Sequence, residues 1–499
     1  MSLLAFIADA HLSDLSGTAQ WACCSWAAAL LCRKKPDAII IAGDVTSCGQ
    51  VRAARRFMRM VEGTGIPFIG IPGNADMRNR DNAAGIVRAI STARTLVLND
   101  TLIVALDAPR GIACKRDLAL CREALGARGR RPMVVVTHCP LDLRAAPPRV
   151  ARMGALFLSA HCHRDAAARS GGNISFSVRG LDPDKAIGGP PCVAYFSFER
   201  GTWRRRDEHF SAGSPAAFSP EEKAEFTDML GLCCLDKPLE TLEFAASRKV
   251  PCVELRALES ITAPGLSGAI SAWRASGGKI LSLHMPALSH APGAPNAKEW
   301  QRQLLRGIRN GIDLVTIHPP GMPVRDMKPG SIVRRNIVRS YAESIAPALA
   351  RGVRVGIENL HAREGERSEG RRAFGCLPLE CLEFVRELKA ACGSSKIGIT
   401  LDIGHARNNN PYSQCISPGD WYALTGICAQ SYHLHQVRRE NGKMVNHRGF
   451  DSLYGPLVSL SGFFWSWKTG SLRHAPIFLE VRQMAARLET LKLLRRAMA

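Results

Sequence analysis

The feature that most constrains this chain is a pattern repeated through its first third, where short apolar runs end abruptly at side chains that bind metal ions. An apolar run of four to six residues between turn-forming residues predicts a buried β-strand. The runs end at Asp9 and His11, at Asp44, at Asn74 and Asp76, at His138, and at His161 and His163. Since ligands gather beyond the carboxyl ends of the strands in a layered α/β fold, we expect these side chains to converge on one site.

The first of these strand ends shows how such a site begins. Asp9 and His11 are two residues apart, so both side chains face the same way on an extended chain. An Asp-x-His pair alone is more often a cap or a turn than a ligand pair. The four later strand ends turn it into part of a predicted metal site.

The rest of the first half predicts ordinary α/β elements. Helices are expected over 19–33 and 50–62, and two segments with alternating apolar residues, 173–178 and 190–198, predict a closing β-hairpin. Ser219 followed by Pro220 predicts a helix start with proline in its first turn. We expect a first domain over 1–212, a linker over 213–226 and a second domain over 227–499, because 499 residues exceed what one core serves.

The second half alternates short apolar strands with helical stretches, which is the rhythm of a (β/α)8 TIM barrel, with a doubly wound sheet as the alternative. The strands are expected over 231–235, 252–255, 280–284, 314–318, 353–358, 397–402, 431–435 and 477–481. Potential ligands again end them: His284, His318, Glu358, Asp402 with His405, His433 and Glu480. Active sites of TIM barrels lie at this face, so a second metal site is predicted.

In its strand-end motifs, the first half resembles the calcineurin-like metallophosphoesterases over roughly residues 1–205. The resemblance implies a four-layer α/β/β/α sandwich with two metal ions. One ion would be held by Asp9, His11, Asp44 and His163, and the other by Asp44, Asn74, His138 and His161. Such mixed ligands suit Mn, Fe or Zn. Asp44, Asn74 and His138 are the candidate catalytic residues.

One position departs from that family's pattern. Ala75 stands where the family usually has a histidine that acts on the leaving oxygen. Because alanine transfers no proton, we expect a phosphodiester or an activated phosphate ester as substrate. Asp76 is a candidate for orienting it. The alternative is a decayed domain without catalysis.

The second half resembles the xylose-isomerase-like superfamily, which includes sugar isomerases, epimerases and endonuclease-IV-type repair enzymes. The resemblance implies one divalent metal (Mn, Zn, Co or Mg) bound by Glu358, Asp402, His433 and Glu480, with Glu358 and Glu480 also transferring protons. His284 and His318 match positions that hold an additional zinc in the nuclease branch. His405 would bind substrate or another zinc.

Two positions distinguish the branches. Gln436 stands where the nuclease branch has an aspartate, and of its later Asp-x-His pair only His447 is present. The isomerase or epimerase branch is therefore favoured. His361, Arg363, His447 and Arg482 are candidate substrate contacts, although each could equally be a solvated loop residue.

Composition adds weaker expectations. The net charge of +22 could indicate a polyanionic partner, but the arginines are spread along the chain, so nucleic acid is not favoured over a small phosphorylated or sugar-containing substrate. The 17 cysteines include no C-x-x-C pair, which predicts unpaired thiols in a reducing compartment. With no signal peptide or membrane span expected, we predict a cytoplasmic protein.

These inferences combine into one hypothesis, a bifunctional metalloenzyme in which a dinuclear phosphoesterase is fused to a metal-dependent sugar isomerase-like barrel. The alternatives are a nucleic-acid repair protein that cleaves phosphodiesters and abasic sites, and a regulatory protein with decayed sites.

Overall fold

The computed structural model describes residues 2–108, 114–129, 131–142, 152–258, 260–288, 296–363 and 370–499. The chain divides into two compact units. Unit 1 contains Met1–Ala217 together with two later segments, Gln414–Gly419 and Tyr454–Trp465. Unit 2 contains Phe218–Ser413, Asp420–Leu453 and Ser466–Ala499. Each unit is described by itself.

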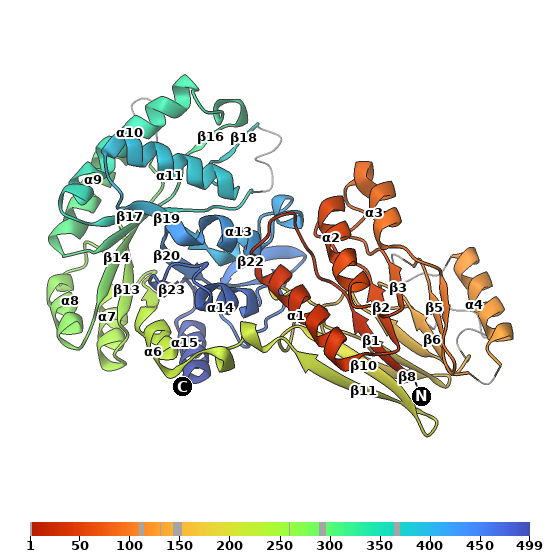
Figure 1. Ribbon diagram of the computed structural model, residues 1–499. Helices are drawn as coiled ribbons and strands as arrows, with labels where there is room; N and C mark the ends of the chain where they lie inside the picture. The colour runs from red at the N-terminus through yellow and green to blue at the C-terminus, as the bar shows by residue number, and fades with distance from the viewer. Residues whose placement is uncertain are drawn as a thin grey trace. The chain divides into compact units, whose positions relative to one another are not determined.

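Unit 1 contains two β-sheets. In the first, parallel strands β1 (Leu3–Ile7), β2 (Ala38–Ala42) and β3 (Phe68–Ile71) are joined by antiparallel β10 (Cys192–Glu199) and β11 (Thr202–His209) in the order β11-β10-β1-β2-β3 (Figure 1). The second has the order β4-β5-β6-β7-β9-β8. Its strands are β4 (Thr95–Val97), β5 (Leu102–Ala105), β6 (Met133–Val136), β7 (Leu156–Ser159), β8 (Ala166–Ser170) and β9 (Asn173–Ser177).

The two sheets pack face to face between helices, which confirms the expected α/β/β/α layers. Alternation along β1 directs Leu4 and Phe6 into the core between the sheets, while Ala5 and Ile7 face the helical side. Helices α1 (Ala19–Lys34), α2 (Val51–Glu62) and α3 (Ala83–Ile90) pack on that side, and α4 (Lys115–Ala127) packs on the outer face of the second sheet.

The expected hairpin between 173–178 and 190–198 is wrong. Strand β9 lies in the second sheet, where it pairs with β7 and β8, whereas β10 lies in the first sheet and pairs with β1 and β11. The intervening chain crosses from one sheet to the other. The partner strand β11 escaped the sequence pattern because it is charged: Arg205 pairs with Asp165 and Asp207.

Two segments from the C-terminal half of the sequence, Gln414–Gly419 and Tyr454–Trp465, complete unit 1. A disulfide joins Cys48 to Cys415, and Arg78 donates hydrogen bonds to the carbonyls of Ser47 and Gln414. The backbone N–H of Gly419 donates to Asp184. The expectation that all cysteines are unpaired is therefore corrected for Cys48 and Cys415, and the other described cysteines form no disulfide.

Unit 2 is a closed barrel of parallel strands, as expected. The order around the barrel is β12-β13-β14-β15-β17-β19-β20-β23, and β23 pairs with β12. The strands are β12 (Leu230–Cys233), β13 (Cys252–Arg256), β14 (Ile280–Met285), β15 (Leu314–Ile317), β17 (Arg354–Glu358), β19 (Ile397–Asp402), β20 (Ala429–Leu434) and β23 (Ile477–Leu479).

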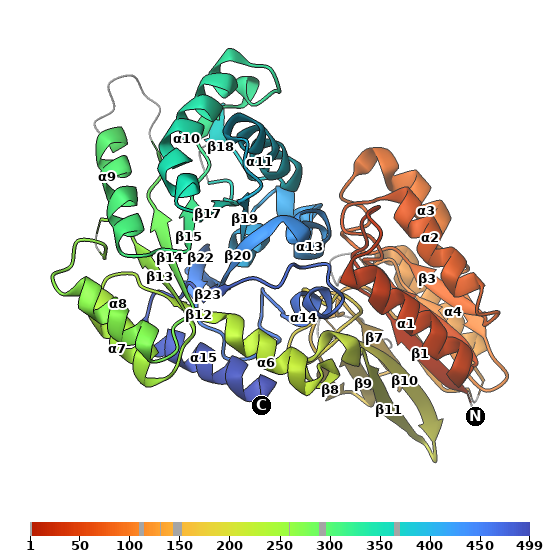
Figure 2. The same cartoon turned by 60° about the vertical axis from the view of Figure 1, so that its left-hand side comes forward.

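Helices surround the barrel strands (Figure 2). They include α6 (Pro220–Met229), α7 (Pro238–Ser247), α8 (Leu266–Ala275), α9 (Asn296–Arg309), α10 (Ile332–Ala350), α11 (Pro378–Cys392) and α15 (Met484–Met498). Two small antiparallel sheets are added: β16 (Gly321–Pro323) pairs with β18 (Arg371–Ala373), and β21 (Gln436–Glu440) forms a hairpin with β22 (Lys443–Arg448). Among the described residues, no helix is long and apolar enough to cross a membrane.

Helix α6 begins where the sequence predicts. The Ser219 hydroxyl accepts the N–H of Glu222 at 3.2 Å, and the Glu222 carboxylate accepts the N–H of Ser219 at 2.7 Å, which forms a capping box. The segment expected as a linker over 213–226 therefore contains the first turns of a capped helix.

Removing this cap should destabilise unit 2. Ser219→Ala loses the acceptor for a helix N–H and should lower its free energy of unfolding by about 1 kcal/mol, while Ser219→Asp keeps an acceptor and should change it little. Urea unfolding followed by circular dichroism measures both. Equal stability of the two variants would contradict the capping role.

Candidate metal centres

The seven predicted ligands of unit 1 lie at the carboxyl ends of its central strands. They follow β1, β2 and β3 in the first sheet, and β6 and β7 in the second. They are Asp9, His11, Asp44, Asn74, His138, His161 and His163.

Most of these residues share a rare backbone conformation. The φ angles are +50° at Asp9, +45° at His11, +49° at Asp44, +65° at His161 and +52° at His163. Non-glycine residues seldom adopt positive φ, and such strain gathers at functional sites. The turns after the strands thus direct these side chains at an energetic cost that the fold must offset.

Glycines allow the turns to approach one another closely. A Cβ atom on Gly43, whose φ is +82°, would lie 2.6 Å from the backbone nitrogen of Gly73. A Cβ on Gly180, also at +82°, would lie 2.6 Å from the Cβ of Asp9. Side chains larger than hydrogen would push the ligand-bearing turns apart.

Asp44 lies between two of the histidines. Its Oδ2 is 3.3 Å from Nε2 of His138 and 3.7 Å from Nε2 of His11, while its Oδ1 accepts the N–H of Ala75 at 2.6 Å. This is the place expected for a carboxylate shared by two ions.

Asp9 and His11 form the other side of the cluster. Asp9 Oδ2 accepts the N–H of His161 at 2.9 Å and lies 3.6 Å from Nδ1 of His163. Within the described residues, neither ring nitrogen of the buried His11 makes a hydrogen bond. A buried polar atom without a partner lowers stability. A metal ion held by Asp9, His11 and His163 would be the missing partner of a His11 ring nitrogen. The donor set therefore fits a metal.

His138 is oriented by the backbone. Its Nδ1 lies 2.8 Å from the carbonyl of Ala42, so Nδ1 carries a proton and Nε2 faces Asn74 Oδ1 at 2.9 Å. Burial disfavours the imidazolium, but the hydrogen bond and charge of Asp44 and the charge of Asp9 outweigh it and raise the pKa of His138 to about 9. The carboxylates thus favour positive charge here, which a divalent ion also provides.

Asp76 needs a correction, because it does not face the space between these ligands. Its fully buried carboxylate accepts the N–H groups of Val45 (3.2 Å), Thr46 (2.7 Å) and Gly73 (2.9 Å), and the Thr46 hydroxyl. Burial and the charge of Asp44 raise its pKa to about 6. Asp76 therefore positions the turns that carry Asp44 and Asn74, and both of its oxygens already accept hydrogen bonds from these turns.

The predicted ligands of unit 2 converge on Glu358 at the end of β17. Glu358 Oε2 lies 3.0 Å from His284 Nε2 and 2.8 Å from His318 Nε2, and Oε1 lies 3.1 Å from His433 Nδ1. His433 Nδ1 is also 3.4 Å from Glu480 Oε2 and 3.9 Å from Asp402 Oδ2. The four residues expected around one ion are thus brought together.

The electrostatics of this cluster also favour a cation. Burial raises the pKa of Glu358, but His318, His433 and His284 hold it well below its ordinary value. Burial also raises the pKa of Glu480, but His447 and His433 hold it well below its ordinary value. Burial lowers the pKa of His433, yet Glu254 and Glu358 raise it well above its usual range. Burial likewise raises the pKa of Asp402, but His405 and His435 outweigh burial and lower this pKa. Three buried carboxylates held ionised around one imidazole are a donor set that fits a divalent metal.

Sequence reasoning missed Glu254, which lies inside β13. Its Oε2 is 2.7 Å from Nε2 of His433, and its Oε1 accepts the hydroxyls of Ser282 and Thr316, each at 2.8 Å. A carboxylate on one ring nitrogen leaves the other to face the metal. The sequence feature that could have revealed Glu254 is its charge within an apolar strand. Alternation places Glu254 in the barrel interior, where aliphatic residues are usual.

His435 is a second residue that sequence reasoning did not assign to the site. It is fully buried, and its Nε2 lies 3.1 Å from Asp402 Oδ1, while its Nδ1 accepts the N–H of His447 at 3.0 Å. A Cβ on Gly404 would lie 1.9 Å from the His435 ring. His435 therefore orients the carboxylate of Asp402, and the lack of a side chain at Gly404 leaves room for the His435 ring.

The candidate substrate contacts line one cavity with Glu358 and Glu480. Its volume is about 630 Å³, within the range of small-molecule sites. His361, Arg363, His405, His447 and Arg482 all line it. His405 Nδ1 lies 3.3 Å from Asp402 Oδ2, and His447 Nδ1 lies 3.4 Å from Glu480 Oε2. Burial and His405 lower the pKa of His361 to about 3, so His361 is neutral.

One comparison with known proteins identifies a family for the first part of the chain. Residues 3–168 match the family model of the calcineurin-like phosphoesterases, so this segment is a calcineurin-like phosphoesterase domain, as the motifs predicted. No curated protein matches the chain.

Several solved structures are similar to parts of the chain. A D-tagatose 3-epimerase-like protein is 17% identical with a TM-score of 0.40, covering 54% of this chain and 97% of that one. A xylose isomerase domain protein from Alicyclobacillus acidocaldarius is 17% identical with a TM-score of 0.38, covering 54% and 96%. A dimetal phosphatase from Danio rerio is 12% identical with a TM-score of 0.33, covering 42% and 96%.

Glu254 provides a test of the barrel centre. Glu254→Gln should weaken the binding of one divalent ion by about 10- to 100-fold, because an amide orients and polarises His433 less well. Competition against a chelating dye measures this affinity. Glu243→Gln, on the outer helix α7, is the matched control. An unchanged affinity in Glu254→Gln would show that His433 needs no such partner.

Proposed function

We propose that the calcineurin-like domain hydrolyses a phosphodiester or an activated phosphate ester with the help of two divalent ions, Mn, Fe or Zn. The observation that carries this proposal is the position of Asp44 between His11 and His138, with Asp9 and His163 on one side and Asn74 and His161 on the other. Two ions held by these residues would activate water and neutralise phosphate charge.

The protein's own residues account for the preference between substrates. Ala75 is fully buried, and its N–H serves Asp44, so this position orients a ligand but offers no proton to a leaving oxygen. General-acid catalysis contributes roughly 10² to 10⁴ in rate, and poor leaving groups need it most. Substrates whose leaving group departs without a proton are therefore favoured.

A pair of chromogenic esters tests this preference. With added Mn or Zn, the full-length protein should hydrolyse bis(p-nitrophenyl) phosphate with higher kcat/KM than p-nitrophenyl phosphate. Asp44→Asn should lower that kcat/KM by about 10³-fold or more, because both ions lose a shared ligand. Asp81→Asn, an exposed acid outside the cluster, is the control. Equal or higher activity on the monoester would contradict the argument from Ala75.

For unit 2, we infer a metal-dependent isomerase or epimerase acting on a sugar or sugar phosphate. The support is the pairing of two ionised carboxylates, Glu358 and Glu480, that both contact His433 and line one cavity. Two such groups can exchange a proton at one substrate carbon, while a bound divalent ion polarises its neighbouring oxygens. Arg363 and Arg482 at the cavity wall suit an anionic or hydroxyl-rich substrate.

Proton exchange gives a direct test of this role. Incubation of the metal-supplemented protein with ketoses and their phosphates in D2O should place deuterium at one carbon-bound position, detected by NMR. Glu480→Gln should slow the exchange by about 10²- to 10⁴-fold. Glu489→Gln, an exposed residue of α15, should leave it unchanged. No exchange with Mn, Zn, Co or Mg would remove the isomerase proposal.

A second candidate for unit 2 is an abasic-site nuclease. His405, His435 and His447 bring their ring nitrogens within 4.8 Å of one another, and so do the ligand atoms of His284, His318 and Glu358, which favours further metal ions. Incubation with duplex DNA containing an abasic site decides the matter. Incision with Mn or Zn that is lost in Glu358→Gln supports the nuclease, and no incision in either metal excludes it.

The presence of both donor sets in one chain also supports a metabolic link between the two reactions. We expect them to act in sequence on one phosphorylated or sugar-containing compound. Matching substrates found by the two assays would support this link, and chemically unrelated substrates would exclude it.

A further inference from the structure

The barrel of unit 2 has a basic hollow at its N-terminal mouth, the end opposite to Glu358 and His433. The hollow has a volume of about 670 Å³. Five cationic residues that precede or begin strands line it: Lys279, Arg351, Arg354, Lys396 and Arg473. Asp313 is the one acid in the lining, which leaves a formal charge of 5 − 1 = +4.

The charges of this hollow are poorly balanced by the protein. Asp313 already accepts hydrogen bonds from Arg274 at 2.5 Å and from the N–H of Leu281 at 2.8 Å. Across the described part of the chain, the guanidinium groups of Arg351, Arg354 and Arg473 make no hydrogen bond or ion pair, whereas Lys279 pairs with Asp228. Three arginines therefore share one space without a counter-ion from the protein.

Arg354 is the most constrained of these residues. Arg354 and Glu358 lie on the same side of β17, because side chains four residues apart on a strand face one way. Glu358 faces the barrel interior, so Arg354 is directed into the mouth at the other end. Burial and then the charge of Arg473 lower the pKa of Arg354, while the charge of Asp313 raises it only in part.

Gln430 adds an unsatisfied polar group to the same hollow. Its side chain is 3% exposed, and its Oε1 makes no hydrogen bond to any described residue. A Cβ on Gly398 would lie 2.8 Å from Cγ of Gln430, so glycine at that position gives the amide its room. A buried amide beside unpaired arginines is the composition of a ligand site, not of a packed barrel end.

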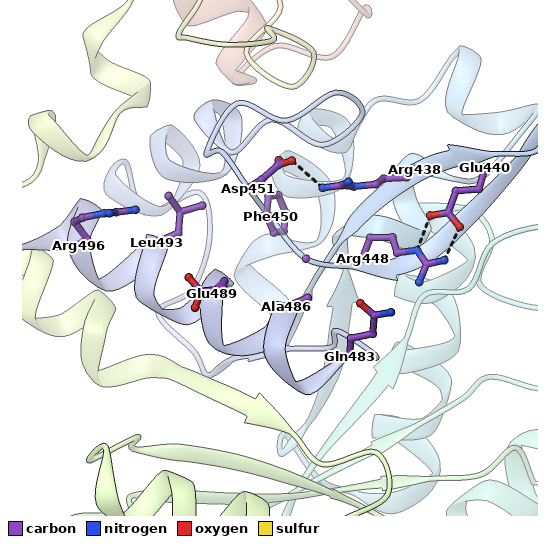
Figure 3. Close-up of a pocket in the computed structure, with 11 residues that line it drawn as sticks. Arg438, Glu440, Arg448, Phe450, Asp451, Gln483, Ala486, Glu489, Leu493 and Arg496 are labelled. Atoms are coloured by element: carbon purple, nitrogen blue, oxygen red, sulfur yellow. Dashed lines mark hydrogen bonds and ion pairs between the residues drawn. The ribbon is translucent and has the colours of Figure 1, made fainter.

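Another hollow of unit 2 shows how this protein balances arginines elsewhere. Between α15 and the β21–β22 hairpin, Arg438 pairs with Asp451 at 2.8 Å and Arg448 pairs with Glu440 (Figure 3). Each of these two arginines has its own carboxylate. Arg496 also lines this hollow and has no ion pair among the described residues, so the barrel mouth differs in that none of its three arginines is paired.

From these observations, we propose that the N-terminal mouth of the barrel binds a small, multiply charged phosphate anion, such as pyrophosphate or a phosphate ester. The planar guanidinium groups of Arg351, Arg354 and Arg473 match phosphate oxygens in geometry as well as charge. The hollow has the size of a small-molecule site. Its cations converge on one space, whereas a nucleic-acid backbone presents phosphates in rows.

Calorimetric titration of the full-length, metal-loaded protein with pyrophosphate at constant ionic strength tests this site. We expect Arg354→Met and Arg473→Ser each to raise the Kd of one binding event by about tenfold or more. Arg325→Ser removes an arginine whose side chain is 87% exposed and lies outside the hollow, and should leave the Kd unchanged. Asp44→Asn and Glu480→Gln should also retain this event, because it does not use the metal centres.

Thermal unfolding separates a ligand site from a structural cation. Pyrophosphate should raise the midpoint of unit 2 in the wild type but not in Arg354→Met. Without pyrophosphate, Arg354→Met should unfold at the wild-type midpoint or above it, because a disfavoured charge has been removed. A lower midpoint in Arg354→Met, together with unchanged binding in Arg473→Ser, would assign these residues a structural role and overturn the proposal.

Two other outcomes would also overturn it. Pyrophosphate binding that is lost in Asp44→Asn but kept in Arg354→Met would assign the anion to the metal centres alone. Binding of a single-stranded oligonucleotide that is lost in Arg354→Met, with no binding of pyrophosphate to the wild type, would identify the mouth as a nucleic-acid contact.

Discussion

The structure depends on the burial of carboxylates, whose charged form a protein interior tolerates only when other groups compensate it. Asp9 and Asp44 in unit 1, and Glu358, Asp402 and Glu480 in unit 2, are all buried at strand ends. Imidazoles surround them in both units, and a divalent cation would stabilise each cluster further. Parallel strands make this possible, because their carboxyl ends bring residues that are distant in sequence to one edge.

The two units hold their clusters by different means. In unit 1 the backbone positions the ligands. Five of them have positive φ angles, glycines allow the turns to approach closely, and backbone N–H groups donate hydrogen bonds to Asp76 and Asp44. In unit 2 side chains orient the ligands, as Glu254 does for His433 and His435 does for Asp402.

Much of this could be predicted because the strands are short apolar runs whose ends carry rare residue types. The barrel order and the gathering of potential ligands at the strand ends follow from that pattern, while the assignment of ligands to individual ions comes from the family resemblances and stays a prediction. Glu254 escaped it because its importance comes from contacts with Ser282 and Thr316 across the barrel, which no local pattern reveals. Asp76 was misjudged because a carboxylate beside a ligand gives no sign of whether it faces substrate or backbone. Strands β9 and β10 follow each other in sequence yet belong to different sheets, which alternation alone does not distinguish.

Unit 1 is built from three stretches of chain, and the last of them ends at Trp465. The turns that carry its predicted metal ligands therefore belong to a unit whose last segments are synthesised only after most of the barrel strands. These segments include Cys415 and Gly419, which contact the N-terminal part of the unit. Domains commonly fold in the order in which the ribosome releases them. Here unit 1 cannot be completed until residues 414–465 have been synthesised. Folding of unit 1 is therefore completed only after most of unit 2 has left the ribosome.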